Sequence, residues 1–314
     1  MEGVKFLRWI LKNHSFFNYY RHHPPVEAMT SLIVDGRKIA NRIKKEVSSE
    51  IKKLESKYGS TPTIATMSIG NSKESELYLK LRDKASYEVG IESRHYRFPE
   101  EVSEREIIEV IDNLNNDQVI HGIMLQQPVP KHLSLYNLLS LVDPRKDVEG
   151  LTPFNLGSLM MGEERIVPCT PLAVLKVLEH EKVELKSRDV VIVNHSPVVG
   201  KPLAALMLNR NATVKVCHVY TKDLKQYTRN ADVLVTAAGV PGLIRGSHVK
   251  EDAVVVDVGI TKTFNGVKGD VDFDEVKKVA GVITPVPGGV GPVTVACFLE
   301  NMLKTYRNCV EEKR

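Results

Sequence analysis

Residues 190–202 read VVIVNHSPVVGKP, and this stretch decides the fold. The four β-branched residues at its start predict a strand that is buried on both faces. The turn that follows contains Asn194, His195 and Ser196, and Gly200 then opens a helical segment. Such a turn can hold a phosphate at the helix N-terminus. Because a G-x-G-x-x-G pattern is absent, an ordinary strand-to-helix turn remains an equal alternative at this point.

The same alternation of strands and helices extends outward in both directions. Apolar runs at 213–217, 233–238 and 253–259 predict further strands, and the glycine content rises after Gly150. Repeated strand–helix units are typical of a parallel α/β sheet with doubly wound topology. On the N-terminal side, the pattern predicts helices over 36–58 and 75–89, strands over 62–69 and 119–125, and a capping box formed by Ser103 and Glu106.

Length and composition are those of a soluble protein with two α/β domains. The chain has 314 residues, of which 42% are hydrophobic and 26% charged, and no apolar run is long enough for a polytopic membrane protein. The net charge of +4 is too small to indicate nucleic-acid binding. The four cysteines form no metal-ligand spacing, so we expect no metal site and a reducing, cytoplasmic location.

Residues 1–28 differ from the rest of the chain. They hold half of the net positive charge and six aromatic residues, and they precede a second methionine at Met29. We interpret this segment as an atypical extension, with mitochondrial targeting as a minor alternative. The domain boundary is expected near 143–150, which gives a first domain over 29–150 and a nucleotide-binding domain over 151–292.

Three further stretches suggest a site. Residues 284–294 read TPVPGGVGPVT, a stiff loop that exposes backbone N–H groups and leads into a helix. Tyr78 and Arg82 are four residues apart, so they share one face of the helix predicted over 75–89. Gln126 and Gln127 end the strand in HGIMLQQP, at the edge of the sheet where ligands bind in such folds.

Together with KDVEGLTPFNLG at 146–157, these stretches resemble the methylenetetrahydrofolate dehydrogenase/methenyltetrahydrofolate cyclohydrolase family. The resemblance covers residues 32–302. It implies a folate-binding domain completed by the C-terminal helix at 293–314, a Rossmann-type cofactor domain, and a cleft between them. It also implies a homodimer that acts in one-carbon metabolism and purine biosynthesis. The substrate would be a tetrahydrofolate-type one-carbon carrier, oxidised with NADP as cofactor, with NAD as the alternative.

The resemblance also assigns residues to roles. Tyr78 matches the tyrosine that orients the pterin, and Gln126 matches the glutamine that partners a catalytic lysine. Pro287 and Gly288 fall in the loop that lines the folate pocket. The positions expected near the cofactor are Thr170, Asn194, His195, Ser196, Ile260, Gly291 and Thr294.

Two departures from the family pattern lie in the expected catalytic pocket. Arg82 stands where the family has its catalytic lysine, and Glu149 stands where it has a folate-binding aspartate. Arginine stays protonated and is a poor proton shuttle. We therefore expect the dehydrogenase activity to survive and the cyclohydrolase activity to be weakened or lost. A monofunctional dehydrogenase and a catalytically silent folate-binding relative remain alternatives. A shikimate-type dehydrogenase is disfavoured by the 284–294 loop.

Overall fold

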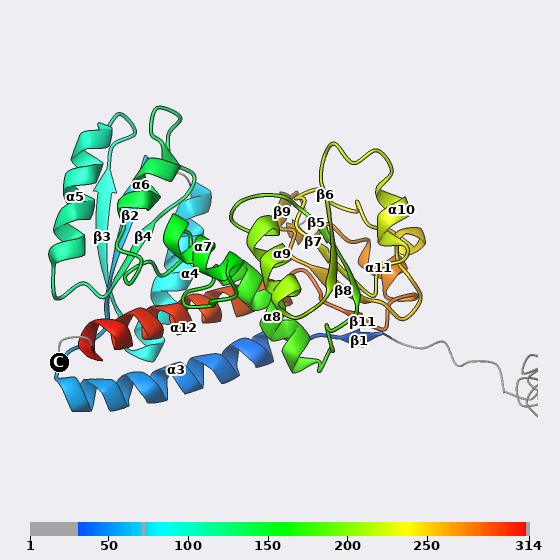
Figure 1. Ribbon diagram of the computed structural model, residues 1–314, viewed down its shortest axis with the longest axis horizontal. Helices are drawn as coiled ribbons and strands as arrows, with labels where there is room; N and C mark the ends of the chain where they lie inside the picture. Colours follow the sequence, from blue (N-terminus) through cyan, green and yellow to red (C-terminus); the bar gives the residue numbers. More distant parts are fainter. Residues whose placement is uncertain (1–30, 71–72, 265, 312–314) are drawn as a thin grey trace, which may run out of the picture.

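The computed structural model describes residues 31–70, 73–264 and 266–311 (Figure 1). The side chains of 73–75, 77 and 78 also lie outside the description. Two parallel sheets form separate lobes, and two long helices, α3 (Gly36–Tyr58) and α12 (Val290–Glu311), run beneath the first lobe as far as the junction with the second (Figure 1). Within the described residues, no helix is both long enough and apolar enough to cross a membrane. The predictions for residues 1–28 fall outside the description.

The first lobe is built on a three-stranded parallel sheet in the order β3-β2-β4. Its first helix, α3, runs over the residues expected for it, from the N-cap Asp35 to Gly59, whose left-handed conformation (φ 68°) ends the helix. The predicted capping box of Ser103 and Glu106 is present at the start of α5. The elements of this lobe are α3 (Gly36–Tyr58), β2 (Thr63–Ile69), α4 (Lys73–Val89), β3 (Glu92–Phe98), α5 (Glu104–Asn116), β4 (Gly122–Leu125) and α6 (Leu135–Leu141).

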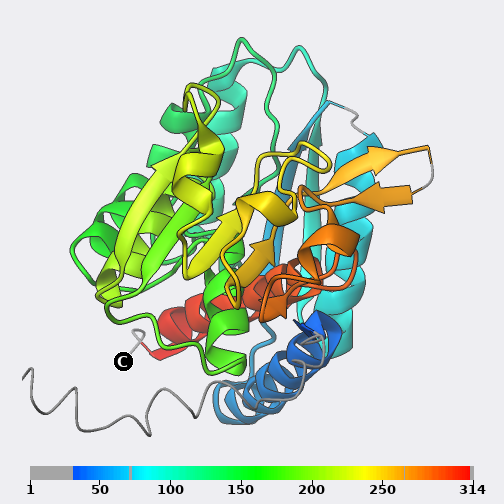
Figure 2. The ribbon, with the colours of Figure 1, turned by 90° about the vertical axis from the view of Figure 1, so that its right-hand side faces the viewer.

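The second lobe is a six-stranded parallel sheet in the order β1-β11-β8-β7-β5-β6, which confirms the doubly wound α/β class. A small antiparallel hairpin, β9–β10, projects from it on the side of α4 (Figure 2). The elements are α7 (Pro153–Met160), α8 (Cys169–His180), β5 (Asp189–Val193), α9 (Gly200–Asn209), β6 (Thr213–Cys217), α10 (Leu224–Thr228), β7 (Val233–Thr236), the 3₁₀ turn η1 (Gly246–His248), β8 (Val254–Asp257), β9 (Thr261–Thr263), β10 (Gly266–Lys268), α11 (Phe273–Val276) and β11 (Val282–Ile283).

The first strand and the last helix of the described chain each contact the other lobe. Strand β1 (Leu32–Ile33) pairs with β11 of the second lobe, which differs from the expectation that 29–150 form one unit. The C-terminal helix α12 (Val290–Glu311) packs along α3 and α8. Its Tyr306 is fully buried, and the hydroxyl donates to the carbonyl of Ser60 in the first lobe. The two lobes are therefore joined by their ends as well as by the 143–168 connection.

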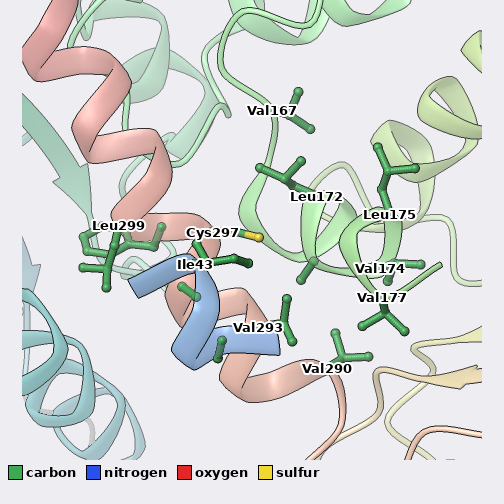
Figure 3. Packing of buried hydrophobic residues seen from close by; sticks show 14 of the residues in the cluster. Ile43, Val167, Leu172, Val174, Leu175, Val177, Val290, Val293, Cys297 and Leu299 are labelled. Carbon is green, nitrogen blue, oxygen red and sulfur yellow. The ribbon is translucent and has the colours of Figure 1, made fainter. Parts of the chain in front are cut away.

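The shared core lies where α3, α8 and α12 meet (Figure 3). Ile43 from α3, Val174 and Val177 from α8, and Val293 and Cys297 from α12 are all at most 4% exposed. Burying an aliphatic side chain of this size stabilises the fold by about 1.5–3 kcal/mol. The core therefore fixes the angle between the lobes, which sets the shape of the cleft above it.

Candidate active site

A buried arginine lies where α4 meets β4 and α12. Arg82, on α4, is 3% exposed, and its Nη2 donates to Oε1 of Gln126 at 3.0 Å. The guanidinium carbon lies 4.6 Å from the centre of the Phe298 ring on α12, and Nη1 contacts Sδ of Met124. The amide nitrogen of Gln126 donates to its neighbour's carbonyl, which fixes the amide orientation. The structure thus brings together two residues that lie 44 positions apart in sequence.

Tyr78 lies on α4 one helical turn before Arg82, which places both on one face of the helix. Its side chain lies outside the description.

Two carboxylates of the 146–150 segment have contrasting surroundings. Asp147 is 3% exposed and accepts the backbone N–H groups of Gly150 at 2.9 Å and Thr152 at 2.8 Å, and the amide of Asn155 at 2.9 Å. It also accepts the N–H of Glu149 at 3.2 Å. Asp147 therefore holds the backbone of this segment in its turn through these four hydrogen bonds. The half-buried carboxyl of Glu149 takes no part in them.

The Glu149 carboxyl titrates near neutrality. Burial raises its pKa to about 7, the nearby Arg82 charge opposes this rise, and Asp147 adds to it. Because the charge of Arg82 acts on Glu149, these two departures from the family pattern lie in one pocket. The thiol of Cys169 belongs to the same surroundings: burial raises its pKa, and the charge of Glu149 adds to that rise.

The 284–294 loop packs against the start of α3. The N–H of Gly36 donates to the carbonyl of Gly288 at 3.0 Å. A Cβ on Gly36 would lie 1.8 Å from the carbonyl oxygen of Gly289, so only glycine allows this approach. A cavity of about 550 Å³ lies beside the loop. It is lined by the predicted residues Pro287, Gly288, Ile260 and Gly291, together with Leu81 of α4 and Arg37, Asn41 and Lys44 of α3.

Two buried aspartates that the sequence analysis did not single out hold three other segments of the second lobe, at 236–240, 257–259 and 270–271. Asp257 accepts three backbone N–H groups, and Asp270 accepts two more and a hydroxyl. Burial raises the pKa of Asp257 to about 6, against the opposing effect of its backbone hydrogen bonds. The donors are the N–H groups of Gly259, Asp270 and Val271 to Asp257, and the N–H groups of Ala238 and Val240 and the hydroxyl of Thr236 to Asp270.

A second cavity, of about 670 Å³, lies at the carboxyl ends of β5 and β6. The predicted residues Asn194, His195 and Ser196 line it, as do Lys201, His218 and Val219. The Asn194 amide is used inside the turn: Oδ1 accepts the N–H groups of Ser196 at 2.8 Å and Gly200 at 3.0 Å. Asn194 therefore shapes the turn, while the side chains of His195 and Lys201 remain to face a ligand.

The remaining predicted cofactor residues occupy other positions. Ile260 is 63% exposed beside the 550 Å³ cavity, and Thr170 is half-buried in the first turn of α8. Thr294 is buried and donates its hydroxyl to the carbonyl of Val290 at 3.3 Å. The predicted cofactor residues thus divide between the two cavities and the floor of the cleft.

The geometry defines a class of protein: a two-lobed α/β protein with a dinucleotide-type cavity at one sheet edge and a second cavity between the 284–294 loop and the helices α3 and α4. Comparison with known proteins identifies the family. The catalytic domain of tetrahydrofolate dehydrogenase/cyclohydrolase matches residues 34–149, and the NAD(P)-binding domain of that family matches residues 168–310. The chain belongs to this family, as the motifs predicted.

Relatives and solved structures agree. The chain is 51% identical over 277 residues to the bifunctional protein FolD of Methanosarcina barkeri, covering 88% of this chain and 96% of the relative. The crystal structure of the FolD dehydrogenase/cyclohydrolase from Campylobacter jejuni superposes with a TM-score of 0.87 at 42% identity, covering 88% and 99% of the two chains. The Trypanosoma brucei enzyme, solved with NADP and an inhibitor, gives 0.85 at 37% identity, covering 89% and 98%. The predicted family, fold, class of activity and nicotinamide cofactor are confirmed.

Proposed function

We propose that this protein oxidises 5,10-methylenetetrahydrofolate to 5,10-methenyltetrahydrofolate with a nicotinamide cofactor in one-carbon metabolism. The observation that carries the proposal is the buried pair of Arg82 and Gln126, held at 3.0 Å, with the charge of Arg82 acting on Glu149. Bound NAD(P) would supply a hydride acceptor. The nitrogen lone pairs of the substrate stabilise the cation that remains, so the protein's main task is to position the substrate.

Each residue of the pocket has a distinct part in that task. The face of α4 that carries Tyr78 orients the pterin. Arg82 and Gln126 donate hydrogen bonds from fixed positions, because Phe298 and the neighbouring carbonyl hold their side chains. Glu149 binds the polar edge of the pterin, and Pro287 and Gly288 form the opposite wall. These roles come from the family resemblance and are supported by the burial and contacts of Arg82 and Gln126.

The cofactor site fits the dinucleotide it would hold. The 670 Å³ cavity is adequate for the adenosine half, and its rim offers the Lys201 ammonium and two imidazoles to phosphate groups. Asn194 and Ser196 hold the turn, and Ile260 and Gly291 line the 550 Å³ cavity. We propose that Thr170 and Thr294 also lie near the cofactor, as the resemblance implies. We propose NADP as the preferred cofactor, with NAD as the alternative.

We further propose that the cyclohydrolase step is weakened relative to that of lysine-containing family members. Adding water to the methenyl product requires proton transfer, and the guanidinium of Arg82 stays protonated. The one group of the described pocket whose pKa lies near 7 is the carboxyl of Glu149. A slow cyclohydrolase dependent on this carboxyl is therefore the expected second activity.

A single assay tests these proposals. Purified protein is given methylenetetrahydrofolate with NADP or NAD, and formation of the methenyl product is followed by its absorbance. Its decay to 10-formyltetrahydrofolate is then followed in the same cuvette against the buffer rate. Oxidation with either cofactor is expected. Absence of hydride transfer with both would overturn the main proposal, and hydrolysis at the rate of a lysine-containing relative would overturn the second.

The remaining proposals concern organisation. We propose a homodimer, as the resemblance implies; largely exposed apolar side chains such as Phe154, Met160 and Met161 are compatible with a covered surface. Light scattering on the eluting protein measures the mass directly. We also propose folding units over 29–150 with α12, and over 151–292, with β1 shared. A cytoplasmic location is supported by all four cysteines being free thiols.

A further inference from the structure

A buried amide on the last helix ties together the two ends of the connection between the lobes. Asn301 of α12 is fully buried, and its Nδ2 donates to the carbonyl of Val148 at 3.1 Å and to that of Val167 at 2.8 Å. Since both partners are carbonyl oxygens, which only accept, the amide nitrogen must be the atom that faces them. One side chain therefore holds two segments that lie more than 130 residues before it in sequence.

The peptide bond that precedes Glu149 is held at both of its polar atoms. Its carbonyl, from Val148, accepts from Asn301 and also from the thiol of Cys169, whose Sγ lies 3.6 Å away. Its N–H, from Glu149, donates to Asp147, and the next N–H, from Gly150, donates to the same carboxylate. Because peptide units are planar, fixing the units on both sides of Glu149 fixes the direction of its Cα–Cβ bond.

The segment also has no room to shift on α12. A Cβ on Gly122 of β4 would lie 2.5 Å from both the Sδ of Met302 and a side-chain carbon of Val148. A Cβ on Gly150, which has a φ of 68°, would lie 2.7 Å from the carbonyl carbon of Val167. Only glycine permits these approaches. The backbone around Glu149 is therefore seated directly on the helix that carries Asn301.

One face of α12 contacts both residues that depart from the family pattern. Phe298 and Asn301 are three positions apart, so they lie on the same face of the helix. The Phe298 ring lies against the guanidinium of Arg82, with 4.6 Å between the guanidinium carbon and the ring centre. Asn301 holds the peptide that leads into Glu149. The relative placement of Arg82 and Glu149 is thus set by a helix outside the segments that carry them.

We propose that Asn301 is a positioning residue for substrate binding: it fixes the backbone at Glu149 and thereby the direction in which the Glu149 carboxyl meets the pterin. This inference rests on the proposed function, because it takes Glu149 to bind the polar edge of the substrate. Asn301 acts only through Glu149, since its own side chain is fully buried beneath the segment.

The most informative variant is Asn301→Thr, because the helix shows what a threonine does there. Thr294 and Thr305 of α12 both donate their hydroxyls to carbonyls of their own helix, at 3.3 Å and 3.0 Å. A threonine at 301 can therefore satisfy its hydroxyl in the same way while releasing Val148 and Val167. Asn301→Ala is the second variant, for use if the first does not fold. The matched control is Thr305→Val, which removes a hydrogen bond from a fully buried residue one turn further along.

The first measurement needs no ligand. Amide hydrogen exchange, followed by NMR, reports how firmly the N–H of Glu149 is held. Asn301→Thr should accelerate its exchange about tenfold through local opening. The N–H of Gly200, which donates to Asn194 in the second lobe, should exchange as before. Thr305→Val should change neither rate. An unchanged rate at Glu149 in Asn301→Thr and in Asn301→Ala would overturn the proposal.

The second measurement is a double-mutant cycle with Glu149→Ala, read as the dissociation constant of 5-formyltetrahydrofolate in titration calorimetry. Asn301→Thr should weaken binding about tenfold when Glu149 is present and less than about twofold when it is alanine, because coupled residues are not additive. A loss of equal size in both backgrounds would show that Asn301 supports the fold in general, and would overturn the proposal.

The two measurements separate this inference from the proposed function. Protein that gives the expected cycle but transfers no hydride would contradict the proposed function alone. Protein that does not bind the folate at all would also contradict the proposed function, and the exchange of the Glu149 amide would then decide whether Asn301 fixes this backbone.

Discussion

The two regions that we propose to bind ligands contain basic side chains of different kinds. Between α4 and α12, Arg82 is buried and held by Gln126 and Phe298. At the edge of the second sheet, His195 and His218 are exposed, and their ring centres lie 4.6 Å apart. A buried guanidinium can position a substrate but is a poor proton shuttle.

The largest effect is expected from replacing the buried Arg82 with lysine, which can exchange a proton. Arg82→Lys supplies an amine that can exchange a proton beside Gln126, and general acid–base catalysis contributes about 10²–10⁴-fold. We expect the cyclohydrolase rate to rise about a hundredfold. The dehydrogenase rate should change by less than about threefold, because its step depends on positioning. Both rates are read in the methenyl absorbance assay.

Lys84→Arg, on the exposed face of the same helix, is the matched control and should change neither rate. If Arg82→Lys left hydrolysis unchanged, the arginine would not be what limits the second activity.

An intermediate effect is expected on stability, through Glu149. Its pKa is raised to about 7 in the folded protein, so the folded state binds more protons than the unfolded state between about pH 4.5 and pH 7. Below that pH range the carboxyl therefore does not lower the free energy of unfolding. As the pH rises through the range, the buried charge lowers the free energy of unfolding progressively. Glu149→Gln should raise the free energy of unfolding by about 2 kcal/mol at pH 8 and leave it unchanged at pH 4.5.

Urea unfolding at the two pH values measures the difference. Glu101→Gln, at an exposed glutamate, provides the comparison and should have no pH-dependent effect. A Glu149→Gln gain of equal size at both pH values would show that the burial of charge is not its cause.

The smallest effect is expected from the lysine of the nucleotide cavity. Lys201→Gln removes a charge that is not paired with any acid lining that cavity, and we expect about fivefold weaker binding of adenosine 2′,5′-bisphosphate. The loss should be the same at pH 6.5 and 8.5, since lysine stays charged over that range. Calorimetry checks this. A pH-dependent loss would mean that Lys201 alters the titration of the imidazoles.

Local signals in the sequence predicted most of the fold. Helical spacing and a terminal glycine placed α3 at its observed residues, and apolar runs located β2, β5 and β6. Strand β3 was not predicted, because its sequence ESRHYRF is that of an exposed edge strand without an apolar run. The β9–β10 hairpin was missed for the same reason, since most of its side chains face solvent.

The sequence motifs predicted only part of the candidate site. Family motifs pointed to Arg82, Gln126 and Glu149, and their proximity required the fold. The proximity of His218 to His195 and of Asp257 to Asp270 carries no local signal, because the two residues of each pair lie 23 and 13 positions apart in sequence.

The exchange of chain ends between the lobes has a consequence for synthesis. The apolar face of α3, with Ile39, Ile43 and Val47, is covered by a helix that begins only at residue 290. Nearly the whole chain must therefore be synthesised before α12 can pack against the first lobe. Strand β1 can likewise pair with β11 only after about 250 further residues have been made. Throughout most of translation this face of α3 therefore lacks α12, its main covering helix, and transiently exposed apolar surface of this kind favours aggregation.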